Sequence, residues 1–505
     1  MRGLILLACA VLSTAPSGYS QIALPAAQYI TTIAGQTTNT TPVFYGDNGP
    51  ATSAILYEPQ GIAIDKSSNV YVADAGFNRI RKVSYNTGYI TTVAGTTTGG
   101  YTGDGGPATS ADITLGAFQN LTVDSVGNLY FVDATCRVRK ITASTGSIST
   151  VAGTGSCGYS GDGGAATSAK ISAARGITVD TLGNIYIADY GNYRVRKITV
   201  SSGVISTVAG NGTQICCGRA SNYGDGGLAT SAEFSGPQSV AIDSNNNIYI
   251  VDQAENRIRM VNASTGIIST VIGTGTAGYT GDGGAAGSAK INNPIDITID
   301  PANNIYFFDW GNNRIRKVAS ATGIISTIAG TSTAGDTGDG GLAANAEISA
   351  RGLTVDAIGN LYFTVQIQSG STFTNSVRVI SGNAYNTFIN PKYIVMGVTY
   401  APPGPSSYVQ YQLSTQVGTT TTYTNSFSSE LAISAAFGAG IAGWDEVNGT
   451  GKGSITGTAS SDWTQGSGNS SSITLSKTTT KAYKTGGTGD AFNPVNHGDD
   501  IIWSG

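Results

Sequence analysis

Six copies of one sequence unit occupy most of this 505-residue chain. Each copy contains an apolar pentapeptide that ends in aspartate, such as GIAID or GITVD, and successive copies lie 56 to 63 residues apart. The closing aspartates are Asp65, Asp124, Asp180, Asp243, Asp300 and Asp356. A period of this length, built of strand-like pieces, is typical of a propeller or a similar closed array in which each unit packs on its neighbours.

Each unit contains four segments in which apolar and polar residues alternate. In the first unit they are GIAID (61–65), NVYVAD (69–74), RIRKV (79–83) and YITTVAG (89–95), named here strands a, b, c and d. Alternation with period two, bounded by Gly, Asn and Asp, predicts β-strands joined by tight turns. The 70 glycines of the chain suit such turns. Four antiparallel strands per repeat form one propeller blade.

The two ends of the array predict how the ring closes. A copy of strand d at 29–35 precedes the first strand a, whereas the sixth unit ends after its strand c at 376–382. We therefore expect 29–35 to form the outer strand of the last blade, which removes a free sheet edge. The predicted fold class is all-β: a six-bladed β-propeller closed by an N-terminal outer strand, followed by a C-terminal β-rich domain.

The repeated segment GIAIDKSSNVYVADAGFNRIRKV and its five counterparts resemble the NHL repeat. The GDGGPATSA insert between units is similar to the inserts of bacterial secreted NHL proteins and of the teneurin NHL propeller. The resemblance implies a β-propeller. It does not select one function, because NHL propellers include ligand-binding and protein-binding domains, sensor domains and a few lyases.

The N-terminal sequence MRGLILLACAVLSTAPSGYSQ is typical of a secretory signal peptide. A short apolar segment is followed by the small residues Gly18 and Ser20, which suit cleavage before Gln21. LLAC at Cys9 is a weak lipoprotein signal, because the apolar run before it is very short. We expect a secreted, periplasmic or cell-surface protein in which 1–20 is the signal peptide.

The remaining chain divides by composition into a propeller at 21–390 and a Ser/Thr-rich β domain at 391–505. Long Ser/Thr strands flank the apolar segment LAISAAFGAGIAGW, which favours a β-sandwich or adhesion module. The same pattern resembles pore-forming β-toxins, so a membrane becomes a partner only if this domain inserts. The ending HGDDIIWSG lacks a closing signal, which is compatible with an incomplete domain.

The charge of the chain is nearly balanced. Lys and Arg number 27 and Asp and Glu 31, so the net charge of −4 gives no reason to expect a nucleic acid or an anionic membrane as partner. We expect a monomer.

The Gly-rich motif of each insert between units contains one aspartate. A calcium site needs about six to eight oxygen ligands, whereas each insert follows its Asp with Gly, Gly, Ala, Ser or Thr. Because Asp-Gly-Gly suits a tight turn with positive φ, we interpret these residues as structural turn aspartates and expect no cofactor, with calcium as the less favoured alternative. They are Asp47, Asp104, Asp162, Asp225, Asp282 and Asp339.

An Asp at the end of strand b and an Arg at the start of strand c are predicted to lie side by side in five units. A charge-assisted hydrogen bond between them would hold the b–c loop. A ring of binding groups is the alternative, although a binding site seldom needs every blade alike. The pairs are Asp74–Arg79, Asp133–Arg137, Asp189–Arg194, Asp252–Arg257 and Asp309–Arg314.

One position of the unit varies although its surroundings repeat. It lies five residues before the closing aspartate of strand a, the innermost strand of a blade, so its side chains should approach the central channel. Amide and guanidinium groups there suit hydroxyl, carbonyl or carboxylate groups of a ligand, and the alternative is hydrated polar filling. The predicted ligand-binding residues are Gln60, Gln119, Arg175, Gln238, Arg351 and, after Ile295 in the fifth unit, Asp296.

The sequence favours binding over catalysis. The only histidine is His497, so the propeller lacks a histidine base or metal ligand, and no GxSxG motif occurs. Asp296, with Asn120, is the only hint of a metal-dependent lactonase or lyase on this face, which we keep as the alternative. The predicted function is an exported binding or adhesion protein for carbohydrate or protein ligands.

Four cysteines follow the signal peptide, and export predicts disulfides. Cys136 lies in a b–c loop one residue shorter than those of units 1, 3, 4 and 5, and Cys157 lies in the adjoining insert, so we predict the pair Cys136–Cys157. Cys216 and Cys217 are adjacent, and they either pair with each other or bond elsewhere.

Overall fold

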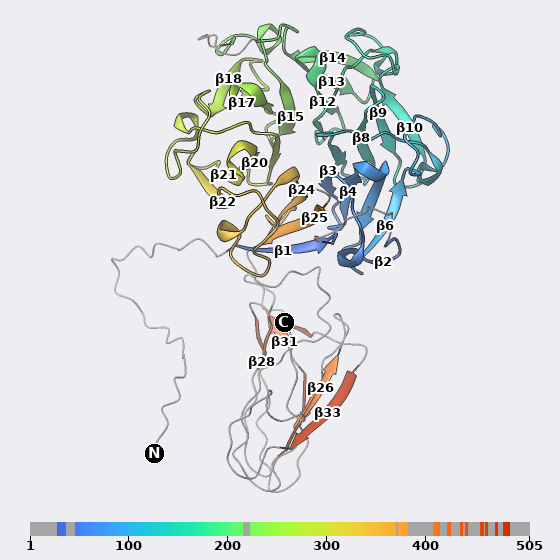
Figure 1. The fold of residues 1–505 in the computed structure, drawn as a ribbon, viewed down its shortest axis with the longest axis vertical. Coiled ribbons are helices and arrows are strands. Elements are labelled where there is room, and N and C mark those ends of the chain that lie inside the picture. Colours follow the sequence, from blue (N-terminus) through green and yellow to red (C-terminus); the bar gives the residue numbers. More distant parts are fainter. Residues whose placement is uncertain are drawn as a thin grey trace.

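The computed structural model describes residues 28–36, 46–215, 223–369 and 372–381, together with short strands between 408 and 484. The described residues up to 381 form six antiparallel sheets arranged around one axis, the predicted six-bladed β-propeller (Figure 1). In each sheet, strand a lies nearest the axis and strand d lies toward the outside, and in blade 1 the two-residue strand β2 (Gly49–Pro50) pairs with the outer side of strand d. The predicted signal peptide, the adjacent cysteines at 216 and 217, His497 and the domain boundary at 390 lie outside the described residues.

The six blades have the following strands, in the order a to d. Blade 1 contains β3 (Pro59–Ile64), β4 (Val70–Asp74), β5 (Arg79–Val83) and β6 (Tyr89–Ala94). Blade 2 contains β7 (Leu121–Val123), β8 (Leu129–Asp133), β9 (Arg137–Ile141) and β10 (Ile148–Ala152). Blade 3 contains β11 (Ile177–Val179), β12 (Ile185–Asp189), β13 (Arg194–Thr199) and β14 (Val204–Ala209). Blade 4 contains β15 (Pro237–Ile242), β16 (Ile248–Asp252), β17 (Arg257–Val261) and β18 (Ile268–Ile272). Blade 5 contains β19 (Asp296–Ile299), β20 (Ile305–Asp309), β21 (Arg314–Val318) and β22 (Ile325–Ala329). Blade 6 contains β23 (Ala350–Val355), β24 (Leu361–Ser369), β25 (Thr372–Ser381) and β1 (Tyr29–Ala34).

Short 3-10 helices occupy two kinds of loop. Those in the inserts are η1 (Ala51–Ser53), η3 (Ala108–Ser110), η4 (Ala166–Ser168), η6 (Ala229–Ser231), η8 (Ala286–Ser288) and η10 (Ala343–Asn345). Those in the b–c loops are η2 (Ala75–Phe77), η5 (Tyr190–Asn192), η7 (Gln253–Glu255) and η9 (Trp310–Asn312). The described residues contain no helix with the length and hydropathy that a membrane span requires.

Beyond the propeller, the described strands pair in twos. The pairs are β26 (Tyr408–Ser414) with β33 (Thr478–Lys484), β27 (Thr422–Asn425) with β30 (Ile455–Thr458), β28 (Ala435–Phe437) with β29 (Gly440–Ala442), and β31 (Ser460–Asp462) with β32 (Ser470–Ser472).

The N-terminal strand closes the ring, as the sequence predicts. Strand β1 pairs antiparallel with β25, with Tyr29 opposite Ser381 and Ile30 opposite Ile380. The sheet order is β1-β25-β24-β23, so the two ends of the repeat array share one blade. The missing strand d of blade 6 is thereby supplied, and the ring is held closed by backbone hydrogen bonds.

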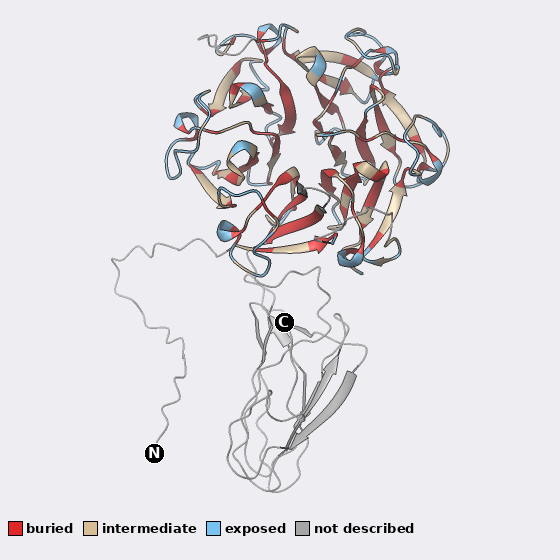
Figure 2. Cartoon of the chain, viewed as in Figure 1, coloured by how far each residue is buried: buried red, intermediate tan, exposed pale blue. Residues whose placement is uncertain are grey.

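The hydrophobic core lies between neighbouring blades, where the inner strands are buried (Figure 2). Strand β8 is buried along its whole length, because both of its faces meet other sheets. In one core cluster, Tyr130 and Val132 of blade 2 pack with Ile185 and Ile187 of blade 3. Each fully buried side chain of this size contributes about 1.5–3 kcal/mol, so the blades depend on each other for stability.

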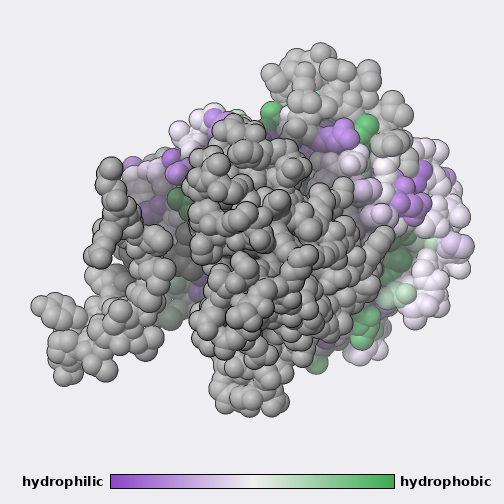
Figure 3. Space-filling model, turned by 90° about the horizontal axis from the view of Figure 1, so that it is seen from below, coloured by the Kyte–Doolittle hydropathy of each residue, from purple (hydrophilic) through white to green (hydrophobic). Residues whose placement is uncertain are grey.

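The most exposed large apolar side chains lie in the a–b turns, and others lie in the inserts and the c–d turns. Val126, Leu182 and Ile358 are examples, each at least 75% exposed. The described surface visible from below mixes hydrophilic and hydrophobic residues (Figure 3). Single exposed apolar residues are normal on protein surfaces, so they are not evidence of a binding site.

The inserts cover the outer edge of each blade. In the insert before blade 2, the Gly105 N–H donates to the Ile148 carbonyl at 2.8 Å, and the Ile148 N–H donates to the Gly106 carbonyl at 3.0 Å. Gly105 has φ 86°, the left-handed conformation that favours glycine. The insert that contains Gly340 covers β1 in the same way. The inserts are therefore more than turns, because they shield the exposed edge of every strand d.

The insert aspartates also bind buried arginines. Asp104 Oδ1 accepts a hydrogen bond from Arg139 Nη2 at 2.7 Å, and Asp104 Oδ2 accepts one from the Thr150 N–H at 2.9 Å. Although partial burial opposes it, the hydrogen bonds from Thr150 and Arg139 hold the pKa of Asp104 below its usual value. The equivalent ion pairs are Asp47–Arg81, Asp162–Arg196, Asp225–Arg259, Asp282–Arg316 and Asp339–Arg378.

The predicted partners of the strand-b aspartates need correction. Asp189 lies opposite Arg194 in the sheet, as expected, but its ion pair is with Arg196, at 3.6 Å. Arg194 instead donates to the carbonyls of Asn192 and Asn211 and stacks on Tyr159. The insert determines which arginine pairs with Asp189, because the insert aspartate and the strand-b aspartate lie on either side of the second arginine of strand c.

The same correction applies in other blades. Asp74, Asp133 and Asp309 form ion pairs with the second arginine of strand c, at 3.5 to 3.7 Å: Arg81, Arg139 and Arg316. The first arginines contact Tyr rings instead, as in Arg137 on Tyr101, Arg257 on Tyr223 and Arg314 on Tyr279. Asp252 accepts the backbone N–H groups of Ser235 and Gly236. Arg79 Nη1 donates to Thr92 Oγ1.

Cys136 and Cys157 form a disulfide, the pair that the sequence predicts. Cys136 has φ 61° and occupies the left-handed position that Asn313 holds in blade 5. The bond joins the b–c loop of blade 2 to the insert that precedes blade 3. It therefore cross-links two loops on one face of the ring.

Replacing Arg196 with Met should destabilise the propeller by about 3–5 kcal/mol, because it leaves the buried Asp189 carboxylate without its counter-charge. Chemical denaturation followed by tryptophan fluorescence measures the loss. Arg194→Met is the matched control, and a loss of about 1 kcal/mol or less is expected, because this side chain is partly exposed. Equal losses in the two variants would contradict the assignment of Arg196 as the buried ion-pair residue.

Reduction of the Cys136–Cys157 bond should lower the free energy of unfolding by about 3 kcal/mol, the chain-entropy value for a loop of this length. Thermal melts with and without reductant measure the effect. The double variant Cys136→Ser/Cys157→Ser should melt at the temperature of the reduced protein. A melting temperature of this variant that still falls with reductant would assign the redox effect to other cysteines.

Candidate functional site

The axis of the propeller is closed by the first residues of the strands a. Gly61, Gly176 and Gly352 lie so near their neighbours that a Cβ on Gly176 would approach Ser239 Cα to 2.6 Å. A Cβ on Gly61 would approach Asn120 Cα to 2.7 Å, so only glycine fits these positions. The cavity that remains on the axis has a volume of about 10 Å³, enough for about one water molecule.

Asp296 ties four blades together at this point. Its carboxylate accepts hydrogen bonds from Ser239 Oγ at 2.6 Å and from the N–H groups of Leu353 and Ile297 at 2.7 and 2.9 Å. Asn120 Nδ2 reaches both carboxylate oxygens at 3.2 Å from the opposite side of the ring. Burial raises the pKa of Asp296 to about 6, although these hydrogen bonds lower it. Both oxygens are engaged in holding the axis closed.

A chain of amide contacts crosses the mouth from blade 2 to blade 6. Gln60 Oε1 accepts the Phe118 N–H at 2.9 Å, and Gln60 Nε2 donates to Gln366 Oε1 at 3.0 Å. Arg351 Nε donates to the same Gln366 oxygen at 3.0 Å. Gln366 lies on the long β24–β25 hairpin, which replaces the short b–c loop of the other blades. The buried Gln60 therefore positions Phe118 and, through Gln366, Arg351.

The remaining predicted mouth residues lie on either side of Phe118. Arg175 Nη1 donates to the buried Gln238 Oε1, and its guanidinium stacks on the Tyr190 ring at 3.5 Å. Gln119 Oε1 accepts the Gly116 N–H at 2.6 Å, so this side-chain amide stabilises its own turn. Burial lowers the pKa of Arg175. Among the predicted residues, Arg175 and Arg351 keep partial exposure, whereas the three Gln and Asp296 are buried.

Phe118 lies between the two guanidiniums. Its ring centre is 5.3 Å from the Arg175 guanidinium carbon and 5.4 Å from that of Arg351. Trp310 packs edge-on against Phe118, with ring centres 6.5 Å apart, and lies 5.5 Å from the Arg351 guanidinium. Phe118, Tyr190 and Trp310 thus lie beside the guanidiniums of Arg175 and Arg351. We call these five residues the mouth cluster.

The backbone of Phe118 has φ 62°, a conformation that is unusual for a bulky side chain. Proline occupies the matching position in blades 1, 4 and 5, and the same loop has positive φ one residue earlier in blades 1, 3 and 5, at Glu58, Ala173 and Asn293. Such strain persists only where neighbouring contacts hold it, and it concentrates at ligand sites. The hydrogen bond from the Phe118 N–H to Gln60 supplies one of those contacts.

Sequence reasoning missed Phe118, Tyr190, Trp310 and Gln366. A signal for two of them existed, because the residue after the strand-b aspartate varies between blades just as the strand-a position does. That residue is Ala75, Ala134, Tyr190, Gln253 or Trp310 in blades 1 to 5. Variation at this second position marks Tyr190 and Trp310.

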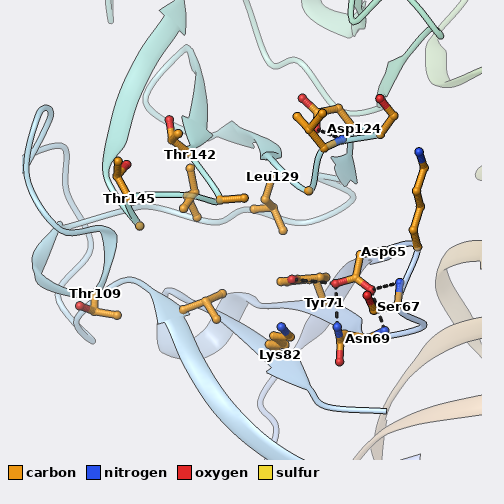
Figure 4. A pocket seen from close by; sticks show the side chains of 18 of the residues that line it. Asp65, Ser67, Asn69, Tyr71, Lys82, Thr109, Asp124, Leu129, Thr142 and Thr145 are labelled. Atoms are coloured by element: carbon orange, nitrogen blue, oxygen red, sulfur yellow. Dashed lines mark hydrogen bonds between the residues drawn. The ribbon is translucent and has the colours of Figure 1, made fainter. Parts of the chain in front are cut away.

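A larger groove opens on the side of the a–b turns, between blades 1 and 2, with a volume of about 810 Å³ (Figure 4). Asp65 lies in its wall, but both carboxylate oxygens are engaged: Oδ1 accepts the Ser67 N–H and Oδ2 accepts Tyr71 O–H and Asn69 Nδ2. Lys82 lies over the Tyr71 ring at 5.5 Å. Asp65, Asn69 and Tyr71 therefore stabilise the turn, and the mouth cluster is the stronger candidate.

Metal ligands do not gather in the described part of the chain: no three His, Cys, Asp or Glu side chains lie close enough to hold an ion. The insert aspartates point to arginines and backbone N–H groups, as described above. The mouth cluster offers guanidinium N–H donors and aromatic faces. These groups can hold a ligand through charge, hydrogen bonds and stacking.

Comparison with known proteins agrees with this architecture. The teneurin NHL domain family matches residues 26–101 and 201–280, and the NHL repeat family matches 173–198. Teneurin-1 of Gallus gallus is 30% identical over 243 residues, which is 44% of this chain and 9% of that protein. NHL repeat-containing protein 2 of Gallus gallus is 33% identical over 123 residues, 24% of this chain and 16% of that protein. The chain thus spans less than a fifth of the length of these relatives.

One solved structure shows the same fold at low identity. A structural genomics protein of unknown function from Bacteroides thetaiotaomicron superposes with a TM-score of 0.50 and 17% identity, over 70% of this chain and 76% of that one. An auxiliary nutrient binding protein from the same organism gives a TM-score of 0.47 at 14% identity, over 70% and 76% of the two chains. The six-bladed ring and the sequence matches together show that the propeller of this chain is built of NHL-type repeats and is similar to the teneurin NHL domain over the matched residues.

Proposed function

We propose that this chain is an exported, non-catalytic binding protein that holds a carbohydrate or protein ligand at the mouth of its propeller. The observation that carries the proposal is the mouth cluster itself. Phe118 is held at φ 62° between two guanidiniums, above an axis that is closed. A strained aromatic residue with cations on both sides is a surface built for contact rather than for packing alone.

The chemistry of the mouth suits recognition. Aromatic faces stack on the apolar faces of sugar rings and on peptide side chains, and guanidinium N–H groups bind hydroxyl, carbonyl or carboxylate oxygens. The Tyr57 ring packs edge-on against Phe373 at 5.4 Å, and Phe373 lies on the β24–β25 hairpin. This hairpin adds a wall beside the mouth that the other blades lack.

The same groups argue against proton transfer. Guanidinium and amide side chains do not change protonation near neutral pH. Asp296 is the carboxylate nearest the axis, and both of its oxygens are engaged in hydrogen bonds. A metal-dependent lactonase or lyase would have to break these contacts, which also hold the blades together.

Export is part of the proposal. It is supported by the signal-like N-terminal sequence and by the Cys136–Cys157 disulfide, because disulfides persist mainly in oxidising compartments.

Tyr190→Ala should weaken ligand binding about 10-fold or more, because it removes an aromatic face and frees Arg175 from its stack. The full chain is first screened on glycan and peptide arrays, and affinities of the hits are then measured by calorimetry. Tyr279→Ala is the matched control, since Tyr279 stacks on Arg314 at 3.9 Å in an insert and not at the mouth. Weakening by Tyr279→Ala alone would move the site to the rim, and no binding on either array would contradict the proposal.

Calcium and chelator should leave the melting temperature unchanged. Each insert aspartate already has a guanidinium within 2.8 Å, so its carboxylate has a counter-charge without a cation. Thermal melts in calcium and in a chelator test this expectation. A large chelator-sensitive fall in melting temperature would favour the metal-dependent alternative instead.

A further inference from the structure

Buried arginines in this propeller are accompanied by carboxylates. Six guanidiniums in the described propeller are almost fully buried, and each lies within 2.5 to 2.8 Å of an insert aspartate oxygen. They are Arg81, Arg139, Arg196, Arg259, Arg316 and Arg378. The pattern follows from physics, because a charge removed from water is costly unless an opposite charge lies beside it.

Arg175 and Arg351 are less buried and lie outside this pattern, as do partly buried arginines at the start of strand c such as Arg194 and Arg314. Arg175 and Arg351 are both partly buried at the mouth, yet neither takes part in an ion pair among the described residues. Their hydrogen-bond acceptors are amide oxygens, that of Gln238 for Arg175 and that of Gln366 for Arg351. Burial lowers the pKa of both guanidiniums.

The geometry at the mouth restricts how an anion can approach. The Tyr190 ring covers the face of the Arg175 guanidinium at 3.5 Å, and Phe118 and Trp310 lie near that of Arg351. An additional partner must therefore meet the guanidinium edges, where the N–H groups point. One edge atom, Arg351 Nη1, is buried and has no hydrogen-bond partner among the described residues.

We propose that the ligand of the mouth cluster carries a carboxylate, which Arg175 and Arg351 bind through their guanidinium edges. This inference rests on the proposed function and names the ligand class. A planar carboxylate matches an edge-on approach between flat rings and accepts two parallel N–H bonds from one guanidinium. The carboxylate belongs either to an acidic sugar or to a peptide, and the chemistry at the site is the same for both.

The two sources are separated by probes that differ only in the charge of the carboxylate. Trimers of galacturonate, glucuronate and mannuronate are compared with their methyl esters, and tetrapeptides with a free C-terminus are compared with the C-terminal amides. Affinities for the full chain are measured by calorimetry. We expect at least one acid to bind at least 10-fold more tightly than its neutral partner, and added salt to weaken that binding.

Variants then locate the interaction. Arg351→Gln and Arg175→Gln should each weaken binding of the acid about 10-fold or more, and Arg351→Lys should retain part of it because the charge remains. Arg314→Gln is the matched control, since Arg314 also stacks on a tyrosine but lies in the outer rim, and it should bind as the wild type does. If a Gln variant fails to fold, the acid–ester comparison on the wild type still decides the question.

Each outcome has a definite reading. Esters or amides that bind as tightly as the acids, with sensitivity to Tyr190→Ala, would overturn the carboxylate assignment and leave the proposed function standing. Preference for sulfated sugars over uronates would also overturn it. Binding that is insensitive to every mouth variant, or no binding at all, would overturn the proposed function together with the inference.

Discussion

The ion pair between each insert aspartate and the second arginine of strand c connects the parts of every blade. In blade 3, the Arg196 guanidinium lies inside the sheet edge, where it contacts Asp162 of the insert and Asp189 of strand b. Asp162 also accepts the Thr207 N–H of strand d. One arginine therefore joins the insert to three strands, and the insert is held where it covers the sheet edge. Without the carboxylate, the buried charge would oppose folding rather than support it.

This interaction also explains why the unit repeats so faithfully. Six blades can close into a ring only if all of them have nearly the same wedge shape. The residues that determine this shape are therefore the same in each copy. Chemical differences are left to positions that do not shape the wedge. The start of strand a and the first residue of the b–c loop are such positions, and both point to the mouth. At the axis itself the demand is steric, and Gly61, Gly176 and Gly352 meet it by having no side chain.

The mouth is where the repeats cease to be alike and where two partly buried guanidiniums lie without a carboxylate partner among the described residues. The buried arginines at the inserts have carboxylate partners within the chain, whereas Arg175 and Arg351 have amide oxygens and aromatic rings. The strain at Phe118 is located between these two guanidiniums. A ligand that carries a negative charge would explain these features together. Its carboxylate would pair with the Arg175 and Arg351 guanidiniums, for which the fold provides no carboxylate partner among the described residues.

Much of this protein follows from the sequence alone. The number of blades and the closure by residues 29–35 depend on local alternation and on counting strands, which the chain displays directly. The Cys136–Cys157 bond follows as well, since blade topology brings those loops to one face.

The arginine partners were predicted wrongly: register places Asp189 opposite Arg194, but Asp162 comes from a third segment and makes Arg196 the partner. Similarly, only closure of the ring brings Phe118, Tyr190, Trp310 and Arg351 from four blades together around one point. The repeat determines the blades because their contacts are local in sequence, whereas the mouth depends on distances across the ring, which no single repeat contains.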